Sequence, residues 1–454
     1  MNILQVNYTD VLGGAARIAY ALHEGFRSRG EDSWMAVGKK TGSDPYVFSF
    51  SDVPVSRFGR LFHSLGSQVE QGSHSNFGRK FGRFFQQVSR QPSHYFYKLL
   101  GVDDFDYSDT WHLMQNKKKP FEIVNLHNLH SNYFDLRFLP VLSRQAPTII
   151  TLHDAWLLSG HCAHSLDCER WKKGCGNCPY LNIDPPVMRD ATAYNWQRKK
   201  KIYQNAHLYI VSPSRQLLNK VKDSVLHPAV KMSKLIRNGI NLSIFKPIDR
   251  SKARAKLNLP QDAFVCLFVA VEAQKNSYKD YQTIRKALKL VSNQWQGKRI
   301  VFIALGGEAG NKMDDGLEVS HVAFIGKLED VALYYQAADI YLHAARAETF
   351  PNTVIEALAC GTPVIATGVG GIPEQIKDGE TGFITLPSDE TAMAERILRI
   401  LGSNELRSKL AFNAALEAGK RFGSESMITE YHSFYKEVIK DWKETFNQDM
   451  INSG

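Results

Sequence analysis

Short apolar runs and longer amphipathic segments alternate along most of this chain. The apolar runs are continuous, as in strands that are buried on both faces of a parallel sheet. In the first half of the chain the predicted strands are 3–6, 34–37, 123–126, 148–152 and 208–211. In the second half they are 264–269, 300–305, 322–325, 339–345 and 363–367. Two such sets predict an α/β protein with two doubly wound, Rossmann-like domains.

Predicted helices fill the gaps between these strands, including one over about 15–29 and one from about Asp280. The last helix, 424–446, has apolar residues at helical spacing, so we expect it to pack back on the first domain. A turn signal at 237–241 separates the two sets of strands. The predicted domains are 1–235, to which the returning segment 426–454 is assigned, and 236–425.

Residues 51–120 interrupt the pattern with basic residues interleaved with phenylalanines, for example in 57–63 and 78–85. Aromatic and cationic residues on a short helix suit a lipid interface. The same composition would fit an insertion whose phenylalanines fill a local core. Single-stranded RNA would also attract such residues, although we expect no nucleic-acid partner.

Composition places the chain among ordinary globular proteins. Its 454 residues are 43% hydrophobic and 22% charged, with a formal net charge of +10. No apolar run is long enough to span a bilayer, and the start of the chain does not read as a secretory signal, so we expect a cytoplasmic protein. The positive charge favours an anionic partner such as a membrane surface or a nucleotide, although basic surfaces also occur without any partner.

The most informative segment is 348–363, where Glu348 and Glu356 bracket a proline that opens an apolar helix. A strand precedes this helix, so the turn lies at the carboxyl edge of a parallel sheet, where nucleotides and phosphates bind. Amides at the helix start can hold a diphosphate, and ionised carboxylates can accept hydrogen bonds from sugar or ribose hydroxyls. The pattern indicates a nucleotide-sugar site. Paired carboxylates also hydrolyse glycosides, but these two belong to one turn and helix and should not face each other across a sugar ring.

Two further groups of residues are expected at the same edge of the first domain. Gly13 and Gly14 follow the first strand and would let the backbone approach a diphosphate or an acceptor, with Arg17 next to them as a phosphate contact. His127 and His153 follow two other strands, and an acceptor hydroxyl benefits from a nearby base or polar group that orients it.

Four cysteines, Cys162, Cys168, Cys175 and Cys178, lie within the loop 153–180. In a cytoplasmic chain this clustering favours a structural zinc site, with His161 or His164 as substitutes for one thiolate. Disulfides or redox pairs, free thiols and an iron–sulfur cluster are the alternatives.

The order of these motifs resembles that of the retaining family-4 glycosyltransferases, which have the GT-B fold. The matching segments are 13–17, 238–247, 348–356 and 368–374, and residues 41–119 remain unmatched. The cysteine segment resembles that of colanic-acid-type enzymes from capsule and exopolysaccharide clusters. The resemblance implies that the two domains face each other across a cleft, the first binding the acceptor and the second the donor.

Residue roles follow from the resemblance. Glu356 would accept hydrogen bonds from the donor ribose, and Glu348 would face the donor sugar, with backbone amides of Phe350, Asn352 and Thr353 nearby. Lys279 would stabilise the departing diphosphate without a catalytic metal, and Lys275 would be the second cation, although the Arg and Gly usual in this loop are absent.

By the same resemblance, His127, His153 and Asp154 lie in the acceptor site, with His153, Glu348 and Lys279 as the catalytic group. The leaving phosphate would take the acceptor proton.

The predicted function is transfer of a hexose-type sugar from a UDP- or GDP-sugar to a saccharide or lipid-linked oligosaccharide in polysaccharide biosynthesis. The enzyme would work in the cytoplasm, with peripheral contact to the anionic inner face of the membrane. A nucleotide-sugar epimerase of the same double fold and a non-catalytic membrane scaffold that binds nucleotide sugars are the alternatives. A metal-dependent transferase using Asp104 and Asp106 is a third.

Overall fold

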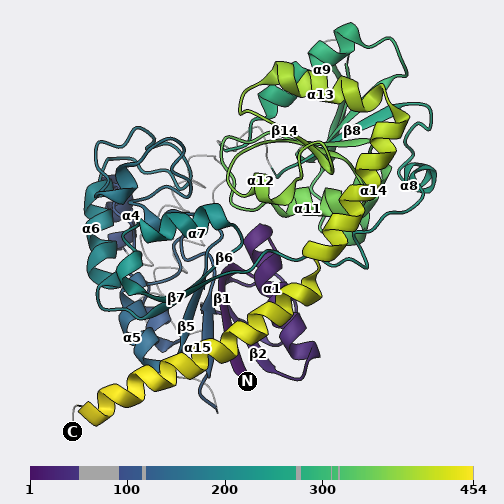
Figure 1. Ribbon diagram of the computed structural model, residues 1–454. Coiled ribbons are helices and arrows are strands. Elements are labelled where there is room, and N and C mark those ends of the chain that lie inside the picture. Colours follow the sequence, from purple (N-terminus) through teal and green to yellow (C-terminus); the bar gives the residue numbers. More distant parts are fainter. Residues whose placement is uncertain (51–91, 115–118, 272–277, 308, 315–316, 453–454) are drawn as a thin grey trace, which may run out of the picture. The chain divides into compact units, whose positions relative to one another are not determined.

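The computed structural model describes residues 1–50, 92–114, 119–271, 278–307, 309–314 and 317–452 (Figure 1). The chain forms two compact units. The first comprises Met1–Val211, Asn219–Lys234 and His432–Gly454, and the second comprises Ser212–Leu218 and Leu235–Tyr431.

The chain passes between the units at Lys234 and Leu235, beside the boundary drawn from the sequence. The sequence division places 212–218 and 426–431 in the first domain, whereas the structure groups both with the second unit. Hydrogen bonds explain the difference. The Arg215 amide donates to Glu374, and the Gly239 amide donates to the Met427 sulfur.

The first unit is built on a seven-stranded sheet with the order β3-β2-β1-β4-β5-β6-β7. Its strands are β1 (Asn2–Thr9), β2 (Asp32–Lys39), β3 (Val47–Ser49), β4 (Ile123–Leu126), β5 (Thr148–Thr151), β6 (Leu208–Ser212) and β7 (Val230–Leu235). β1 pairs in parallel with β2 on one side and with β4 on the other. The strand order therefore reverses between β1 and β4, and crevices at such switch points are where open α/β sheets bind ligands.

Helices and single 3₁₀ turns connect these strands. The helices are α1 (Gly14–Ser28), α4 (Pro92–Leu100), α5 (Leu139–Gln145), α6 (Thr192–Tyr203) and α7 (Arg215–Lys222). The 3₁₀ turns are Ser108–His112, Leu136–Phe138, Trp156–Leu158, Arg170–Lys172 and His227–Ala229. Most of the predicted basic and aromatic insertion lies outside the described residues.

The C-terminal helix α15 (Ser424–Asn452) packs on the first unit from His432 onward (Figure 1). The Tyr435 hydroxyl accepts a hydrogen bond from Gln5 of β1 at 3.1 Å, and the Tyr209 hydroxyl of β6 donates to Asp441 at 2.7 Å. The Trp442 indole donates to the carbonyl of Ser143 at 2.8 Å. These contacts confirm the predicted return of the last helix to the first domain.

The second unit contains a seven-stranded sheet with the order β10-β11-β9-β8-β12-β13-β14. Its strands are β8 (Phe264–Val269), β9 (Ile300–Gly307), β10 (Gly310–Asp314), β11 (Leu317–Ala323), β12 (Ile340–His343), β13 (Val364–Thr367) and β14 (Gly382–Thr385). β9 and β12 flank β8 in parallel, so this sheet reverses its order at β8. β10 is antiparallel to β11 at the sheet edge and is not predicted by the sequence pattern.

Helices cover both faces of the second sheet, as continuous apolar strands require. They are α8 (Arg250–Lys256), α9 (Tyr281–Gln294), α10 (Leu328–Ala337), α11 (Asn352–Ala359), α12 (Ile372–Gln375), α13 (Glu390–Leu401) and α14 (Asn404–Arg421). Val265 and Leu267 of β8 pack in one core with α10 and α11, while Cys266 and Phe268 pack in the other with α9 and α13. The prediction of two doubly wound α/β domains is confirmed.

Candidate functional site

The turn from β12 to α11 carries the two glutamates of the sequence motif. β12 is completely buried between β8 and β13. Pro351 precedes α11 with φ −64° and ψ 122°, so the chain changes from extended to helical conformation at the proline. The helix ends before Gly361, whose φ of +71° is the left-handed cap expected from the sequence. The first amides of α11 and the positive end of its dipole therefore lie at the carboxyl edge of the sheet.

Glu348 is held by two partners from different elements. Its Oε1 atom forms an ion pair with Lys279 Nζ and lies 3.0 Å from His343 Nε2. Burial alone would raise the pKa of Glu348, but the Lys279 charge and the His343 hydrogen bond outweigh it and hold the pKa well below the usual range. Glu348 is therefore an ionised carboxylate at neutral pH, able only to accept hydrogen bonds.

Lys279 is placed by the backbone around it. It forms an isolated antiparallel bridge with Ala345, and the Arg346 amide donates to the Tyr278 carbonyl at 2.8 Å. The predicted diphosphate lysine thus lies beside the predicted sugar carboxylate. Lys275, the predicted second cation, lies outside the described residues.

Glu356 is more deeply buried than its predicted ribose contact requires. Only 2% of it is exposed, and the Tyr335 hydroxyl donates to its Oε2 at 3.0 Å. At the start of α11, the Asn352 side chain accepts a hydrogen bond from Asn238 at 2.9 Å. The Phe350 ring packs against Phe422, so only the backbone of Phe350 remains for a donor contact. Thr353 lies in the first turn of α11.

A glycine-rich loop closes on this turn. The Gly371 amide donates to the Thr349 carbonyl at 2.9 Å. Gly370 has φ +58°, and a Cβ atom there would lie 1.7 Å from the Glu348 carbonyl oxygen. Only glycine fits this contact, so the second glycine loop of the motif set supports the backbone of Glu348.

The predicted glycines of the first unit lie at the start of α1. Gly13 has φ +97° and precedes the helix, and Gly14 is its first residue. Both are exposed, and a Cβ atom at Gly13 would meet nothing within 4 Å, so there is open space beside it. Arg17 is half-buried in the first turn. These three residues belong to the first unit, whereas Lys279, Glu348 and Glu356 belong to the second.

The predicted histidines at the ends of β4 and β5 come together. His127 and His153 stack with ring centroids 5.2 Å apart, and His127 Nδ1 lies 2.9 Å from His153 Nε2. His127 Nε2 donates to the side-chain oxygen of Gln5 at 3.0 Å. His127 Nδ1 must then accept a hydrogen bond from His153 Nε2–H, because a neutral imidazole has one N–H. His153, which is half-buried, therefore keeps Nδ1 as its acceptor.

Burial and charge separate the protonation states of this cluster. Burial lowers the pKa of His153 to about 4 and that of His127 well below its usual value, so both rings are neutral. His130 Nε2 lies 2.8 Å from Asp154, and that carboxylate raises the pKa of His130 despite its burial. Asp154 is half-buried, and loss of solvent alone would raise its pKa, but His130 and the Trp156 amide lower the pKa to about 2. The structure thus joins His127 to His153 and gives Asp154 a different partner, His130.

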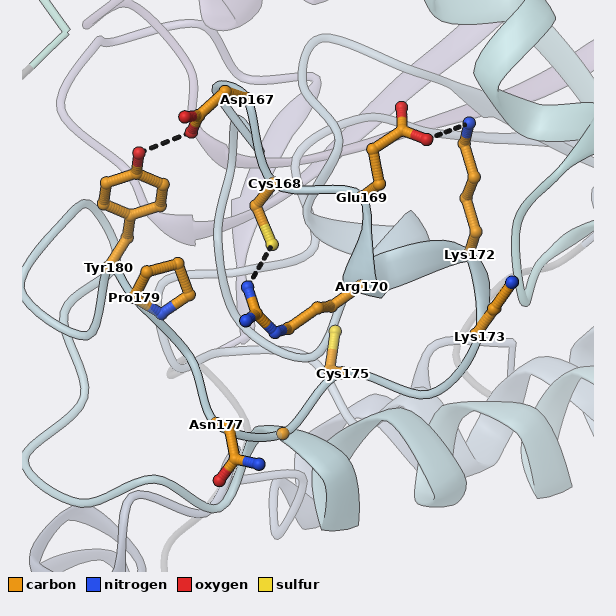
Figure 2. Close-up of a pocket in the computed structure, with 11 residues that line it drawn as sticks. Asp167, Cys168, Glu169, Arg170, Lys172, Lys173, Cys175, Asn177, Pro179 and Tyr180 are labelled. Atoms are coloured by element: carbon orange, nitrogen blue, oxygen red, sulfur yellow. Dashed lines mark hydrogen bonds and ion pairs between the residues drawn. The ribbon is translucent and has the colours of Figure 1, made fainter.

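The four clustered cysteines are divided in the structure. Cys168 and Cys175 line an open cavity of about 680 Å³, with Arg170 reaching toward the Cys168 sulfur (Figure 2). Cys178 Sγ lies 3.4 Å from His161 Nε2. Burial raises the pKa of the Cys162 and Cys178 thiols and that of Cys175 to about 12.

Within the described ranges, no three or more His, Cys, Asp or Glu side chains form a group that could hold a metal ion. The zinc predicted at Cys162, Cys168, Cys175 and Cys178 therefore gains no support from this geometry and stays a prediction. Asp104 and Asp106, the alternative metal clamp, have separate partners, because Asp104 pairs with His94 and Asp106 with Arg137.

Comparison with known proteins identifies the class of this enzyme. Residues 249–417, which include Lys279, Glu348 and Glu356, match the family model described as Glycosyl transferases group 1. Over 460 residues the chain is 24% identical to the putative colanic acid biosynthesis glycosyl transferase WcaC of Escherichia coli K12, which covers 96% of this chain and 100% of that protein. The chain therefore carries a group 1 glycosyltransferase domain, and the enzyme class is that of a glycosyltransferase.

Other relatives agree with this assignment. Over 122 residues the chain is 35% identical to N-acetyl-alpha-D-glucosaminyl L-malate synthase of Bacillus anthracis, which covers 27% of this chain and 32% of that protein. Sucrose-phosphate synthase of Thermosynechococcus elongatus aligns with TM-score 0.62 and 19% identity over 97% of this chain and 100% of that chain. Anabaena HepE, solved with UDP and glucose, aligns with TM-score 0.59 and 16% identity over 96% and 99%. These structures establish the GT-B fold and confirm the predicted fold. The predicted enzyme class is confirmed by the family model and the colanic acid relative.

Proposed function

We propose that this group 1 glycosyltransferase transfers a hexose-type sugar from a UDP- or GDP-sugar, with retention of configuration, to a saccharide or lipid-linked oligosaccharide in polysaccharide biosynthesis. The observation that carries the proposal is the Lys279–Glu348 ion pair at the β12–α11 turn, inside the matched domain. In this pair a cation and an ionised carboxylate lie at the edge of the sheet where phosphates bind.

The donor proposal follows from these charges. A diphosphate would take the Lys279 ammonium and the first amides of α11, and Glu348 would accept hydrogen bonds from the sugar hydroxyls. The Lys279 charge would stabilise the departing diphosphate, so that the proposed transfer needs no catalytic metal. The Anabaena HepE structures with UDP and with UDP-glucose support a nucleotide-sugar donor.

The acceptor proposal rests on the histidines of the first unit. His153 Nδ1 can accept a hydrogen bond from an acceptor hydroxyl, while its depressed pKa makes the ring a weak base. We therefore assign to His153 the role of orienting the acceptor hydroxyl. The leaving phosphate would take the proton of that hydroxyl, which suits retention on one face of the sugar. The name of the colanic acid relative supports a polysaccharide product.

A lipid-linked acceptor would bring the enzyme to the cytoplasmic face of a membrane. Phe96, Leu99 and Leu100 of α4 are exposed apolar side chains, and the chain carries a net charge of +10, which suits an anionic surface. Among the described residues, no helix combines the length and apolarity needed to cross a bilayer. The contact we propose is peripheral.

The experiment is proton NMR of the purified enzyme with a panel of UDP- and GDP-sugars. We expect slow hydrolysis of one donor, in which water takes the place of the acceptor and the nucleoside diphosphate is released. The free sugar that forms first should have the anomeric configuration of the donor. Inverted sugar would contradict the retaining mechanism, and a panel that is neither bound nor consumed would contradict the donor class. An epimerase would convert the sugar without releasing the diphosphate, and a scaffold would bind a donor without turnover.

A further inference from the structure

His343, the last residue of β12, lies between Glu348 and Tyr341 with no exposed surface. Its Nε2 atom is 3.0 Å from Glu348 Oε1, and its Nδ1 atom is 3.0 Å from the Tyr341 hydroxyl. Both ring nitrogens therefore have partners, one of which is the motif carboxylate. Sequence reasoning treats this histidine only as part of a strand.

The chemistry of the three groups fixes the direction of each hydrogen bond. Burial and the Lys279 charge lower the pKa of His343, so the ring is neutral and has one N–H. Because Glu348 is ionised and can only accept, this N–H lies on Nε2. His343 Nδ1 then accepts from Tyr341, whose hydroxyl keeps its proton because burial raises its pKa. Tyr341 therefore donates a hydrogen bond to His343, and His343 donates one to Glu348.

Lys279 and His343 share one oxygen of the carboxylate. In the described part of the chain, the hydrogen bonds recorded for the Glu348 side chain are both to Oε1. A donor diphosphate carries more negative charge than a carboxylate and would compete for the Lys279 ammonium. His343 is buried and held by Tyr341, so it would stay beside Glu348 when Lys279 moves to the diphosphate. The Oε1 atom would then keep one partner inside the protein.

We propose that His343 is a positioning residue for Glu348: it holds Oε1 in place when Lys279 turns to the donor diphosphate, and leaves Oε2 to accept a hydroxyl of the donor sugar. This inference rests on the proposed function and extends it to a residue that touches no substrate. It also gives Lys279 two successive partners, Glu348 without donor and the diphosphate with it.

The test compares His343→Leu, which removes the N–H, with His343→Gln, whose amide can replace it near the Nε2 position. We expect His343→Leu to lower kcat roughly 10- to 100-fold with KM for the donor nearly unchanged, the range typical of partners that orient functional groups. His343→Gln should restore most of kcat. His23→Gln is the matched control, because His23 is an equally buried histidine that contacts Ser33 in the first unit.

The pH profile separates positioning from a structural role. The groups that face the Glu348 carboxylate are Lys279, His343 and, through His343, Tyr341. Removing the His343 N–H withdraws stabilisation from the ionised carboxylate, so the pKa of Glu348 should rise and the acid limb of kcat should move to higher pH. Tyr341→Phe should move it less in the same direction, and it decides the matter if His343→Leu does not fold. An unmoved limb, or His343→Gln as inactive as a folded His343→Leu, would overturn the inference.

A readout without turnover keeps this inference distinct from the proposed function. With nitrogen-15-labelled histidine, NMR should show His343 as the neutral Nε2–H tautomer at neutral pH and still neutral at about pH 6.5, where an ordinary histidine is half protonated. Glu348→Gln should change this signal. If no nucleotide sugar is consumed but this tautomer is found, the proposed function fails and the hydrogen-bond chain stands. An Nδ1–H tautomer or a charged ring would refute the chain even in an active enzyme.

Discussion

Histidines at the ends of buried strands determine how functional groups are held in both units. His127 and His153 follow β4 and β5 in the first unit, and His343 is the last residue of β12 in the second. Burial keeps each ring neutral, so each has one N–H, and a fixed neighbour decides which nitrogen carries it. Gln5 is that neighbour for His127, and Glu348 is that neighbour for His343.

We predict that Gln5→Leu impairs the orienting role of His153, although Gln5 contacts His127 and not His153. The change leaves the His127 N–H without an acceptor in the core, which should cost about 1–3 kcal/mol of stability. It also frees His127 to move its proton to Nδ1, and His153 would then lose its fixed tautomer. We expect a lower kcat and a raised KM for the acceptor, measured with saturating donor.

Tyr435→Phe is the milder companion, since it removes only the hydroxyl that contacts the Gln5 amide nitrogen. Its effect on kcat should be smaller than that of Gln5→Leu. Wild-type kinetics in a folded Gln5→Leu enzyme would show that the tautomer of His153 does not matter.

The sequence alone predicts the residues whose signal is local. Glu348 and Glu356 stand out by their spacing around a helix start, and His127 and His153 by following apolar runs. Gln5 and His343 fall inside predicted strands instead of after them, and their partners come from folding: Gln5 contacts His127 across neighbouring strands, 122 residues away. The ion pair between Lys279 and Glu348 likewise joins residues 69 positions apart.

At the scale of elements, the glycine loop before α12 packs against the β12–α11 turn and supports its backbone. The Gly371 amide and the position of Gly370 tie this loop to the backbone of Glu348 and Thr349. The geometry of Glu348 therefore depends on a loop about twenty residues further along the chain.

We predict that Gly370→Ala destabilises the second unit more than a matched glycine substitution does. Gly379→Ala is the control, because Gly379 also has a positive φ, +74°, but a methyl group added there would meet nothing within 4 Å. The control should cost about 1–2 kcal/mol for its left-handed backbone. Gly370→Ala should cost a further 1–3 kcal/mol or so for overlap with the Glu348 carbonyl. Chemical unfolding measures both, and equal losses would contradict the close contact.

Element boundaries are predicted well where a cap or a turn residue marks them. Asp280 accepts from the Thr283 amide at the start of α9, and α15 begins at Ser424, as the sequence pattern indicates. The strand predicted over 322–325 is wrong in its bounds, because β11 runs from Leu317 to Ala323. Its alternating residues and its antiparallel partner β10 make an edge hairpin, for which the continuous apolar pattern gives no signal.

At the scale of the whole molecule, both units use the same design, a largely parallel sheet whose strand order reverses next to its first strand. The reversal lies between β1 and β4 in the first unit and at β8 in the second. The predicted acceptor histidines follow β4 and β5, and the predicted donor residues follow β12. Each group thus occupies the carboxyl edge beside a switch point, where the fold leaves room for a ligand.

Calorimetric titration of UDP and GDP into the enzyme tests most directly whether the second unit binds a diphosphate through Lys279. Wild-type enzyme should bind one of the two nucleotides, and Lys279→Met should weaken that binding roughly 10- to 100-fold, as expected for loss of a charged hydrogen bond. Lys286→Met is the control, since Lys286 forms an exposed ion pair with Glu390 in the same unit, and it should bind like wild type. Equal affinity of the Lys279 and Lys286 variants, or a wild-type enzyme that binds neither nucleotide, would contradict the proposed donor site.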